Sequence, residues 1–280
     1  MQKKLLILLL TLLFVMVACG EDSTNSDEEE NFDEETKVED DEENEAEHKT
    51  GVSEQNEAGQ SPEEVEEKPQ EPQYEVLEDA SIVPIKEDAN EEVVLLTIDD
   101  APDTYALEMA ETLQNLNVNA IFFVNGHFID TSEEQSVLKT IHDMGFMIGN
   151  HTYNHPYLPD LTEEEQKEEI VALNDLVEDI IGERPRFFRA PNGANTDFSR
   201  QVAEEEDMIV MNWSYGYDWE SDYQSKEAIA DIMVNTELLT SGANLLMHDR
   251  EWTAAALEDI VTGLQAKGYE IVDPALIKTK

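Results

Sequence analysis

Between residues 93 and 272, short apolar segments alternate regularly with amphipathic helical patterns, and this alternation leaves few possible folds. Short apolar runs indicate buried strands, whereas apolar residues three and four positions apart indicate helices. Strands that are separated by helices normally run parallel, so the pattern predicts an α/β fold whose sheet is closed as a barrel or doubly wound. In such folds the catalytic groups lie where strands end and loops begin.

The predicted elements number about seven strands and six helices. The strands are expected at residues 93–98, 120–124, 146–149, 186–189, 208–213, 244–247 and 269–272. The helices are expected at residues 105–116, 133–144, 162–181, 196–206, 226–236 and 253–267. The third helix has the clearest signals, because Thr162 and Glu165 form a capping box and Gly182 follows its last residue.

The net charge of −49 excludes several kinds of partner. Residues 21–70 hold 22 acidic residues and three lysines, and the 44 acidic and 12 basic residues from 71 onward leave that part near −32. Nucleic acid is excluded because phosphate contacts require Lys and Arg. Anionic lipid headgroups and anionic wall polymers would also be repelled, so a neutral substrate is expected.

The first 18 residues have the pattern of a signal peptide. Lys3 and Lys4 precede an apolar run over 5–17, which is shorter than the roughly 20 residues that span a bilayer. The sequence Val-Ala-Cys-Gly that ends at position 20 resembles a bacterial lipobox, which implies cleavage before Cys19 and lipidation of that residue. The alternative is an ordinary secretory signal with an incidental cysteine. Cys19 is the only cysteine, so no intramolecular disulfide can form.

Residues 19–72 are expected to form a disordered tether. Acidic and amide residues dominate this segment, and it has too few large apolar side chains to fold. Repulsion between like charges would keep it extended. The predicted organisation is therefore a lipid-anchored linker that carries a domain over residues 73–280, outside the bacterial cell membrane.

Two pairs of potential metal ligands follow predicted strands. Asp99 and Asp100 follow the first strand. Their carboxylates are expected to point in different directions, so that one could bind a metal while the other acts as a base. The alternative is that both are structural turn residues. His151 and His155 follow the third strand, and their spacing would place both rings on one face of a helical turn, unless they are surface histidines. One Asp and two His with an open position are typical of catalytic zinc, although cobalt, nickel or manganese fit the same ligands.

Other polar residues also lie at predicted strand ends. Arg189 leaves an apolar strand and needs a carboxylate partner, whether for catalysis or as a structural salt bridge. Asp218 and Trp219 follow the fifth strand. His248 ends the sixth strand beside Asp249, a position that suits an acid–base group.

Five segments occur in an order that resembles the polysaccharide deacetylase family, also called the NodB homology domain, a carbohydrate esterase type. The segments are Thr97-Ile98-Asp99-Asp100, His151-Thr152-Tyr153-Asn154-His155, Arg189-Ala190-Pro191-Asn192-Gly193, Asp218-Trp219 and Leu246-Met247-His248. The resemblance covers roughly residues 85–275. It implies a distorted (β/α) barrel, which agrees with the predicted strands.

The resemblance assigns the first group of residues to metal binding and proton removal. It implies that Asp100, His151 and His155 bind a divalent metal. It further implies that Asp99 is the general base and that Arg189 pairs with Asp99 and keeps it ionised.

The second group is assigned to proton donation and substrate binding. His248 would be the general acid and Asp218 would set its protonation, while Trp219 and Leu246 would wall the acetyl methyl group. The backbone N–H of Asn192 would help to hold the oxyanion. Two features depart from the family pattern: position 192 is usually aromatic, and the spacing between positions 213 and 218 is one residue shorter.

The resemblance implies a metal-dependent enzyme that hydrolyses N-acetyl groups of N-acetylglucosamine residues in a cell-surface glycan such as peptidoglycan, releasing acetate. One alternative is deacetylation of chitin oligomers or O-acetylated polysaccharide. Another is a catalytically weak lipoprotein that binds or stabilises the wall, which only the departures at Asn192 and Asp218 favour. We expect a monomer that contacts glycan through the domain and membrane through Cys19.

Overall fold

The computed structural model of the protein describes residues 71–280. The predicted signal peptide, Cys19 and nearly all of the predicted linker 19–72 lie outside these residues, so the structure does not test them. Within the described part, no helix is both long enough and apolar enough to cross a membrane.

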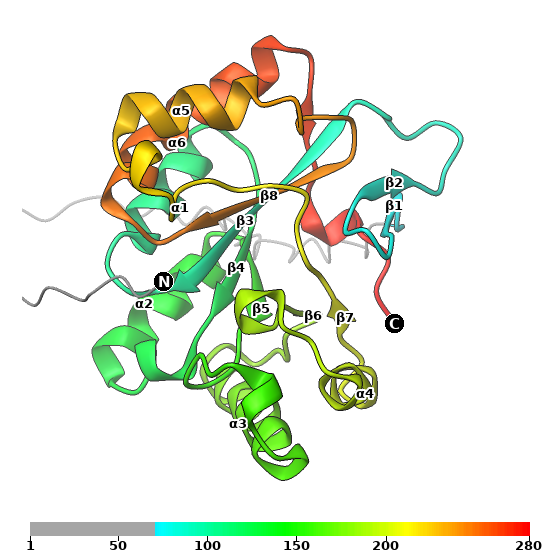
Figure 1. Cartoon of the computed structure of the whole chain (residues 1–280), viewed down its shortest axis with the longest axis vertical. Helices are drawn as coiled ribbons and strands as arrows, with labels where there is room; N and C mark the ends of the chain where they lie inside the picture. The colour runs from blue at the N-terminus through cyan, green and yellow to red at the C-terminus, as the bar shows by residue number, and fades with distance from the viewer. Residues whose placement is uncertain (1–70) are drawn as a thin grey trace, which may run out of the picture. The chain divides into compact units, whose positions relative to one another are not determined.

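A single parallel sheet forms the centre of the described part (Figure 1). Its seven strands are ordered β7-β6-β5-β4-β3-β8, and β9 pairs with β3. Every pairing is parallel, which confirms the predicted α/β class and strand number. The strands are β3 Val93–Ala101, β4 Ile121–Val124, β5 Met147–Asn150, β6 Phe187–Phe188, β7 Ile209–Val210, β8 Ala243–His248 and β9 Glu270–Ile271.

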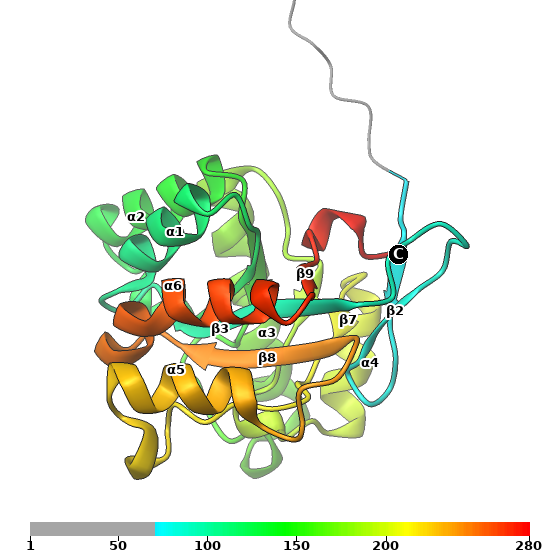
Figure 2. The same cartoon turned by 90° about the horizontal axis from the view of Figure 1, so that it is seen from above.

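Helices connect these strands and cover the outside of the curved sheet (Figures 1 and 2). They are α1 Ala106–Asn115, α2 Ser132–Asp143, α3 Glu163–Ile181, α4 Asp197–Glu205, α5 Lys226–Asn235 and α6 Glu251–Ala266. The predicted capping box at the start of α3 is confirmed, because Thr162 Oγ1 accepts from the Glu165 N–H and Glu165 accepts from the Thr162 N–H. Gly182 ends α3 in the left-handed conformation.

The sheet curls into a distorted barrel that closes through an irregular segment. The predicted strand 208–213 is too long, because β7 covers only Ile209–Val210. After Met211 the chain leaves β6 and crosses to β8, where the Ser214 N–H donates to the Asn244 carbonyl over 2.8 Å. The crossing carries the next loop, which contains Asp218, toward the carboxyl end of β8.

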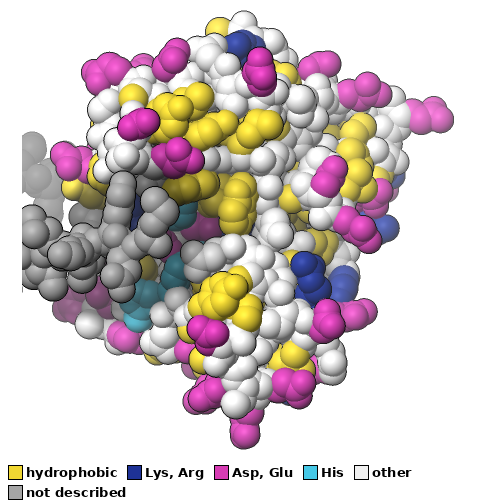
Figure 3. All heavy atoms as spheres, in the orientation of Figure 1, with side chains coloured by type: hydrophobic (Ala, Val, Ile, Leu, Met, Phe, Trp, Pro, Cys, Tyr) yellow, Lys and Arg dark blue, Asp and Glu magenta, His cyan; other side chains and the backbone are white. Residues whose placement is uncertain are grey.

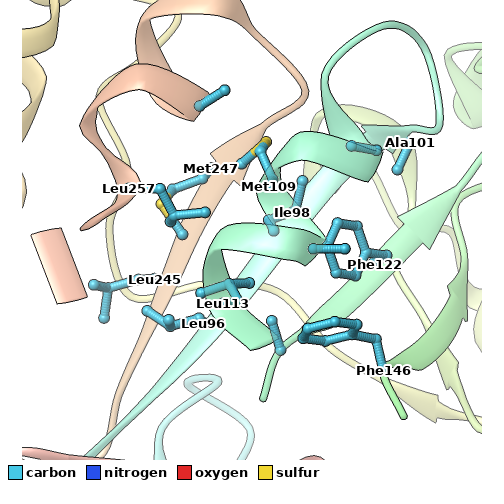
Figure 4. Close-up of a cluster of buried hydrophobic side chains, with 14 of the residues drawn as sticks. Leu96, Ile98, Ala101, Met109, Leu113, Phe122, Phe146, Leu245, Met247 and Leu257 are labelled. Carbon is cyan, nitrogen blue, oxygen red and sulfur yellow. The ribbon is translucent and has the colours of Figure 1, made fainter. Parts of the chain in front are cut away.

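Both faces of the central strands are buried. Leu95, Phe123 and Phe187 belong to a cluster on one face and fill the interior of the sheet's curve. The opposite face of the sheet packs against the helices, and Figure 4 shows this second cluster. Its labelled side chains include Leu96 and Ile98 of β3, Phe122 of β4, Leu245 and Met247 of β8, Met109 and Leu113 of α1 and Leu257 of α6. A barrel filled in this way leaves its carboxyl end as the place for a site.

A small antiparallel sheet precedes the barrel and was absent from the prediction. It consists of β1 Tyr74–Val76 and β2 Ile82–Pro84. Ile82 is buried, and its N–H donates to the Gly242 carbonyl over 2.8 Å. Strands of three residues are too short for alternation to be recognised in a sequence.

Candidate active site

The two aspartates lie inside β3, which extends to Ala101 and so beyond the predicted end at residue 98. The pairing of β3 with β4 shifts between Ile98 and Ala101, and Asp100 has a φ of 59°. This bulge turns the strand locally, so both Asp99 and Asp100 line one pocket. The two carboxylates still have different partners, since Asp99 contacts Arg189 and Asp100 belongs to the cluster with His151 and His155.

The two histidines lie in the loop that follows β5. The predicted helical turn is wrong, because Thr152 and His155 have φ values of 69° and 55° and the segment is irregular. The ring centroids are nevertheless 5.0 Å apart. The loop is fixed by the buried Asn150, whose side-chain oxygen accepts from the Thr152 N–H over 2.9 Å. One ligand atom from each of Asp100, His151 and His155 lies within 4.8 Å of the other two.

The hydrogen bonding of His151 shows that this cluster fits a cation. Its Nδ1 lies 2.7 Å from the Arg189 carbonyl, which can only accept, so Nδ1 carries the proton. Burial lowers the pKa of His151, despite Asp99 and Asp100, and this favours the neutral ring. The Nε2 lone pair then faces carboxylate oxygens of Asp99 at 3.5 Å and Asp100 at 3.8 Å. A lone pair opposed to two carboxylates is stabilised by a cation between them, and neutral imidazole is the form that binds metal.

Arg189 is fully buried beneath the aspartates. Its Nη1 donates to Asp99 Oδ1 over 2.7 Å and to Thr97 Oγ1 over 2.8 Å. Its Nε and Nη2 donate to the carbonyls of Met211 and Asn212 over 3.0 and 2.9 Å. The guanidinium is thus held at several points, so it fixes one oxygen of Asp99 and leaves the other facing the pocket.

Asp218 and His248 form a second pair on the other side of the pocket. His248 Nδ1 lies 2.7 Å from Asp218 Oδ1, and the His248 N–H donates to Asp218 Oδ2 over 2.6 Å. The fully buried Asp218 also accepts from Thr253 Oγ1 over 2.9 Å. Burial lowers the pKa of His248, but the hydrogen bond and charge of Asp218, together with the charges of Asp99 and Asp100, outweigh it and raise the pKa.

These residues surround one cavity of about 400 Å³ at the carboxyl end of the barrel. Its lining consists of Asp99, Asp100, His151, His155, Asn192, Trp213, Trp219, Leu246 and His248. Figure 3 shows the hollow, with histidine and acidic side chains beside apolar ones. Trp219 is 47% exposed and packs edge-on against His248 at a centroid distance of 5.5 Å, whereas Leu246 is buried. Asn192 is exposed and has a φ of 56° in the turn after β6.

The structure brings all the predicted domain residues to this pocket or to its supports, and it adds several that the sequence did not reveal. Trp213 lines the pocket, and Thr253 supports Asp218. Trp252 donates from Nε1 to the Asp218 carbonyl over 2.8 Å. Arg250 donates to Asp100 over 3.0 Å. In the sequence these residues are marked only by their proximity to His248 or to the end of a strand. Neighbouring loop residues share this feature, so the sequence does not identify them as part of the site.

The fold and the pocket define an α/β-barrel protein with a candidate hydrolytic site that combines acid–base pairs with a potential metal centre. The family model described as polysaccharide deacetylase matches residues 86–211. A curated relative from Bacillus cereus is 30% identical over 200 residues, and the match covers 70% of that protein. The chain belongs to the polysaccharide deacetylase family.

Two curated relatives show what the chain is similar to. A protein of Bacillus cereus named peptidoglycan-N-acetylglucosamine deacetylase is 30% identical, and the match covers 68% of this chain and 70% of the relative. A protein of Bacillus subtilis named peptidoglycan-N-acetylmuramic acid deacetylase PdaC is 30% identical over 210 residues, with 73% of this chain and 42% of the relative covered. The chain therefore spans less than half the length of the second relative.

One solved structure with the same fold is that of a pseudoenzyme. Wild-type BA3943 from Bacillus anthracis, described as a CE4 family pseudoenzyme, superposes with a TM-score of 0.59 at 28% identity. The superposition covers 65% of this chain and 63% of that one. Family membership alone therefore does not decide whether a chain is active, and the residues of the pocket must be considered.

Proposed function

We propose that the protein is a metal-dependent deacetylase that removes N-acetyl groups from N-acetylglucosamine residues of peptidoglycan and releases acetate. The observation that carries the proposal is the presence in one pocket of a held base, Asp99, a held acid, His248, and the cluster of Asp100, His151 and His155. Amide hydrolysis needs both proton transfers, because water must lose a proton as it attacks and the amine must gain one as it leaves.

Asp99 is the general base of the proposed reaction. Its Oδ1 is held by Arg189 at 2.7 Å, and its Oδ2 faces His151 Nε2 at 3.5 Å across the pocket. Asp99 Oδ2 takes a proton from water as the water oxygen bonds to the acetyl carbon. Arg189 is a positioning residue that keeps the carboxylate oriented and balances its charge in a buried place.

His248 is the general acid. Its Nδ1–H donates to Asp218, so the Nε2–H of the protonated ring is free to face the substrate. When the carbon–nitrogen bond breaks, Nε2 gives its proton to the amine nitrogen. The raised pKa of His248 keeps the ring protonated over a wider pH range, as an acid requires. The products are acetate and a glucosamine-type amine.

Asp100, His151 and His155 would hold the divalent cation. One carboxylate and two imidazoles suit zinc, and cobalt, nickel or manganese accept the same donors. When bound, the cation supplies Lewis-acid polarisation of the acetyl carbonyl and activation of water. The backbone N–H of Asn192 helps to hold the oxyanion, and Trp219 and Leu246 wall the methyl group.

The substrate assignment rests on the relatives and on charge. Both curated relatives carry names of peptidoglycan deacetylases, one for N-acetylglucosamine and one for N-acetylmuramic acid. A neutral N-acetylglucosamine unit agrees with the neutral substrate expected for a strongly acidic domain. The choice between the two sugars rests on the first relative, of which the match covers 70%, against 42% of the second.

A comparison of substrates tests this assignment. Acetate release is measured with purified peptidoglycan, chitin oligomers and acetylated xylan, and the sugars of the treated peptidoglycan are then identified. We expect release from peptidoglycan, with glucosamine as the new sugar. New muramic acid with an unsubstituted amine, or faster release from acetylated xylan, would contradict the substrate assignment. Binding to peptidoglycan without any turnover would favour the alternative of a wall-binding protein. The similarity to a structure described as a pseudoenzyme is the reason to test this alternative.

The pH dependence of activity tests the pairing of Asp218 with His248. Asp218 raises the pKa of His248, and activity needs protonated His248, so activity falls as the pH rises through this pKa. Asp218→Asn lowers the pKa and should move the alkaline limb of the kcat/KM profile to lower pH. Asp231→Asn, which removes an exposed carboxylate on α5, is the matched control and should leave the limb in place. An unshifted limb in Asp218→Asn would mean that His248 is not the acid.

We further propose that the protein is a lipoprotein tethered through Cys19 to the outer face of the bacterial cell membrane. The support is the pattern of the first 20 residues and the acidic segment that follows them. The wild type should be labelled by radioactive palmitate, and Cys19→Ser should lose this labelling. Equal labelling of the variant and the wild type, or no labelling of the wild type, would contradict the anchor.

A further inference from the structure

Arg250 contacts Asp100 of the candidate metal cluster, and the proposed reaction assigns no role to Arg250. Its Nη2 donates to Asp100 Oδ2 over 3.0 Å. The other oxygen of Asp100, Oδ1, lies 3.5 Å from His155 Nε2 and 3.8 Å from His151 Nε2. The two oxygens of one carboxylate therefore face different partners: Oδ1 faces the imidazoles and Oδ2 faces the guanidinium.

The backbone that carries Arg250 is firmly held. Arg250 immediately precedes α6, and its neighbour Asp249 is buried. The Asp249 carboxylate accepts from the N–H groups of Thr104 and Ala106, both over 3.0 Å, and the Asp249 N–H donates to the Asp99 carbonyl over 3.1 Å. These bonds connect the start of α6 to β3 and to the segment after it. Arg250 is thus attached to the same frame as the carboxylate that it contacts.

The side chain of Arg250 is also guided at a second point. Its Nη1 lies 3.2 Å from the Asp249 carbonyl and 3.8 Å from a carboxylate oxygen of Asp103. The side chain is 38% exposed, so its contact with Asp100 lies near the surface of the domain. A guanidinium presents its donors in a fixed planar fork, so contacts at Nη1 fix the direction of Nη2.

We propose that Arg250 is a positioning residue for metal binding, which holds Asp100 Oδ2 so that Asp100 offers only Oδ1 to the cation. This inference rests on the metal site of the proposed function. Without Arg250, Asp100 Oδ2 would be released and both oxygens could turn toward the cation. Groups that hold a metal ligand by hydrogen bonds typically contribute about 10- to 100-fold to metal affinity.

The charge of Arg250 predicts the opposite effect, so the sign of the change decides between the two roles. A positive charge beside a cation site repels the cation, and its removal would tighten binding if repulsion dominated. If instead the main role of Arg250 is to orient Asp100 by a hydrogen bond, then loss of this hydrogen bond would weaken metal binding. We expect orientation to dominate, because Arg250 contacts the oxygen that faces away from the imidazoles.

The test is the Zn²⁺ affinity of the full chain, measured without glycan by competition with a chromophoric chelator. Arg250→Met should weaken binding by about 10- to 100-fold. Arg250→Gln, which keeps an N–H donor, should weaken it less. Arg186→Met is the matched control, because Arg186 is exposed, pairs with Glu183 at 3.7 Å and precedes the amino end of β6, and it should bind like the wild type. Should Arg250→Met fail to fold, Arg250→Gln carries the same comparison.

Binding by Arg250→Met that equals or exceeds that of the wild type would overturn the inference. Wild-type protein that binds no Zn²⁺ would instead contradict the proposed function, so the two failures are distinguishable. The visible spectrum of the saturated Co²⁺ form gives a second readout, because a second carboxylate oxygen raises the coordination number and weakens the absorption. We expect weaker absorption in Arg250→Met, and an unchanged spectrum would contradict the holding of Oδ2.

Discussion

Asp99→Asn should reduce kcat/KM for acetate release by about 10²- to 10⁴-fold, the range in which a positioned general base contributes. The amide of asparagine retains an oxygen that can accept from Arg189, but it cannot take a proton from water. The substitution also leaves the buried Arg189 without its charged partner, although Thr97, Met211 and Asn212 still accept from it. Some loss of stability is therefore expected together with the loss of activity.

Metal binding and folding separate these two effects. Asp99 lies outside the cluster of three ligand atoms, so Asp99→Asn should still bind Zn²⁺ and should keep the circular dichroism spectrum of the wild type. Activity is compared at a temperature where thermal unfolding shows both proteins to be folded. A folded, metal-loaded Asp99→Asn enzyme that keeps activity within about tenfold of the wild type would exclude Asp99 as the base.

His155→Ala should lose both metal binding and turnover. The side chain of His155 is 35% exposed and lies in a loop, so its removal creates no cavity in the core, and the fold should persist. It supplies one of the three ligand atoms that lie within 4.8 Å of one another. With only Asp100 and His151 left, the variant should have the residual activity of wild-type protein treated with a chelator.

The matched control for this variant is His142→Ala. His142 belongs to α2 and is partly buried, but it does not line the pocket. It should bind metal and release acetate like the wild type. Equal activity of His155→Ala and the wild type at the same metal concentration would show that His155 is not a ligand.

The sequence predicted the architecture where elements are long and failed where they are short. The alternation of apolar strands and amphipathic helices was sufficient for a parallel sheet of seven strands, because each element buries a continuous face. It missed β1 and β2, and it extended the strand at 208–213 beyond Ile209–Val210. Pairing in these segments is decided by distant partners such as Gly242 and Asn244, which local patterns do not contain.

The site was predictable as a set of residues but not as a geometry. Strand ends placed Asp99, His151 and His248 near one another, because the carboxyl ends of parallel strands meet at one edge. The left-handed backbone of Asp100 and His155 was not predictable, since a non-glycine residue adopts it only when its surroundings impose it. This backbone brings both carboxylates and both imidazoles into one pocket.

Supporting residues were hidden for a different reason. Thr253 acts through Asp218, and Arg250 acts through Asp100. Both residues lie in or beside a predicted amphipathic helix, where polar and charged residues are common. Their roles depend on contacts between residues that are 35 and 150 positions apart. Such contacts become visible only when the barrel is assembled.

The central claim, metal-dependent deacetylation of a wall glycan, is tested most directly by acetate release from purified peptidoglycan. The full chain is measured as purified, after exhaustive treatment with a chelator, and after Zn²⁺, Co²⁺, Ni²⁺ or Mn²⁺ is returned. We predict release by the untreated protein, loss of release with the chelator, and recovery with at least one of these metals. The absence of release with every added metal, or release that the chelator leaves unchanged, would contradict the account.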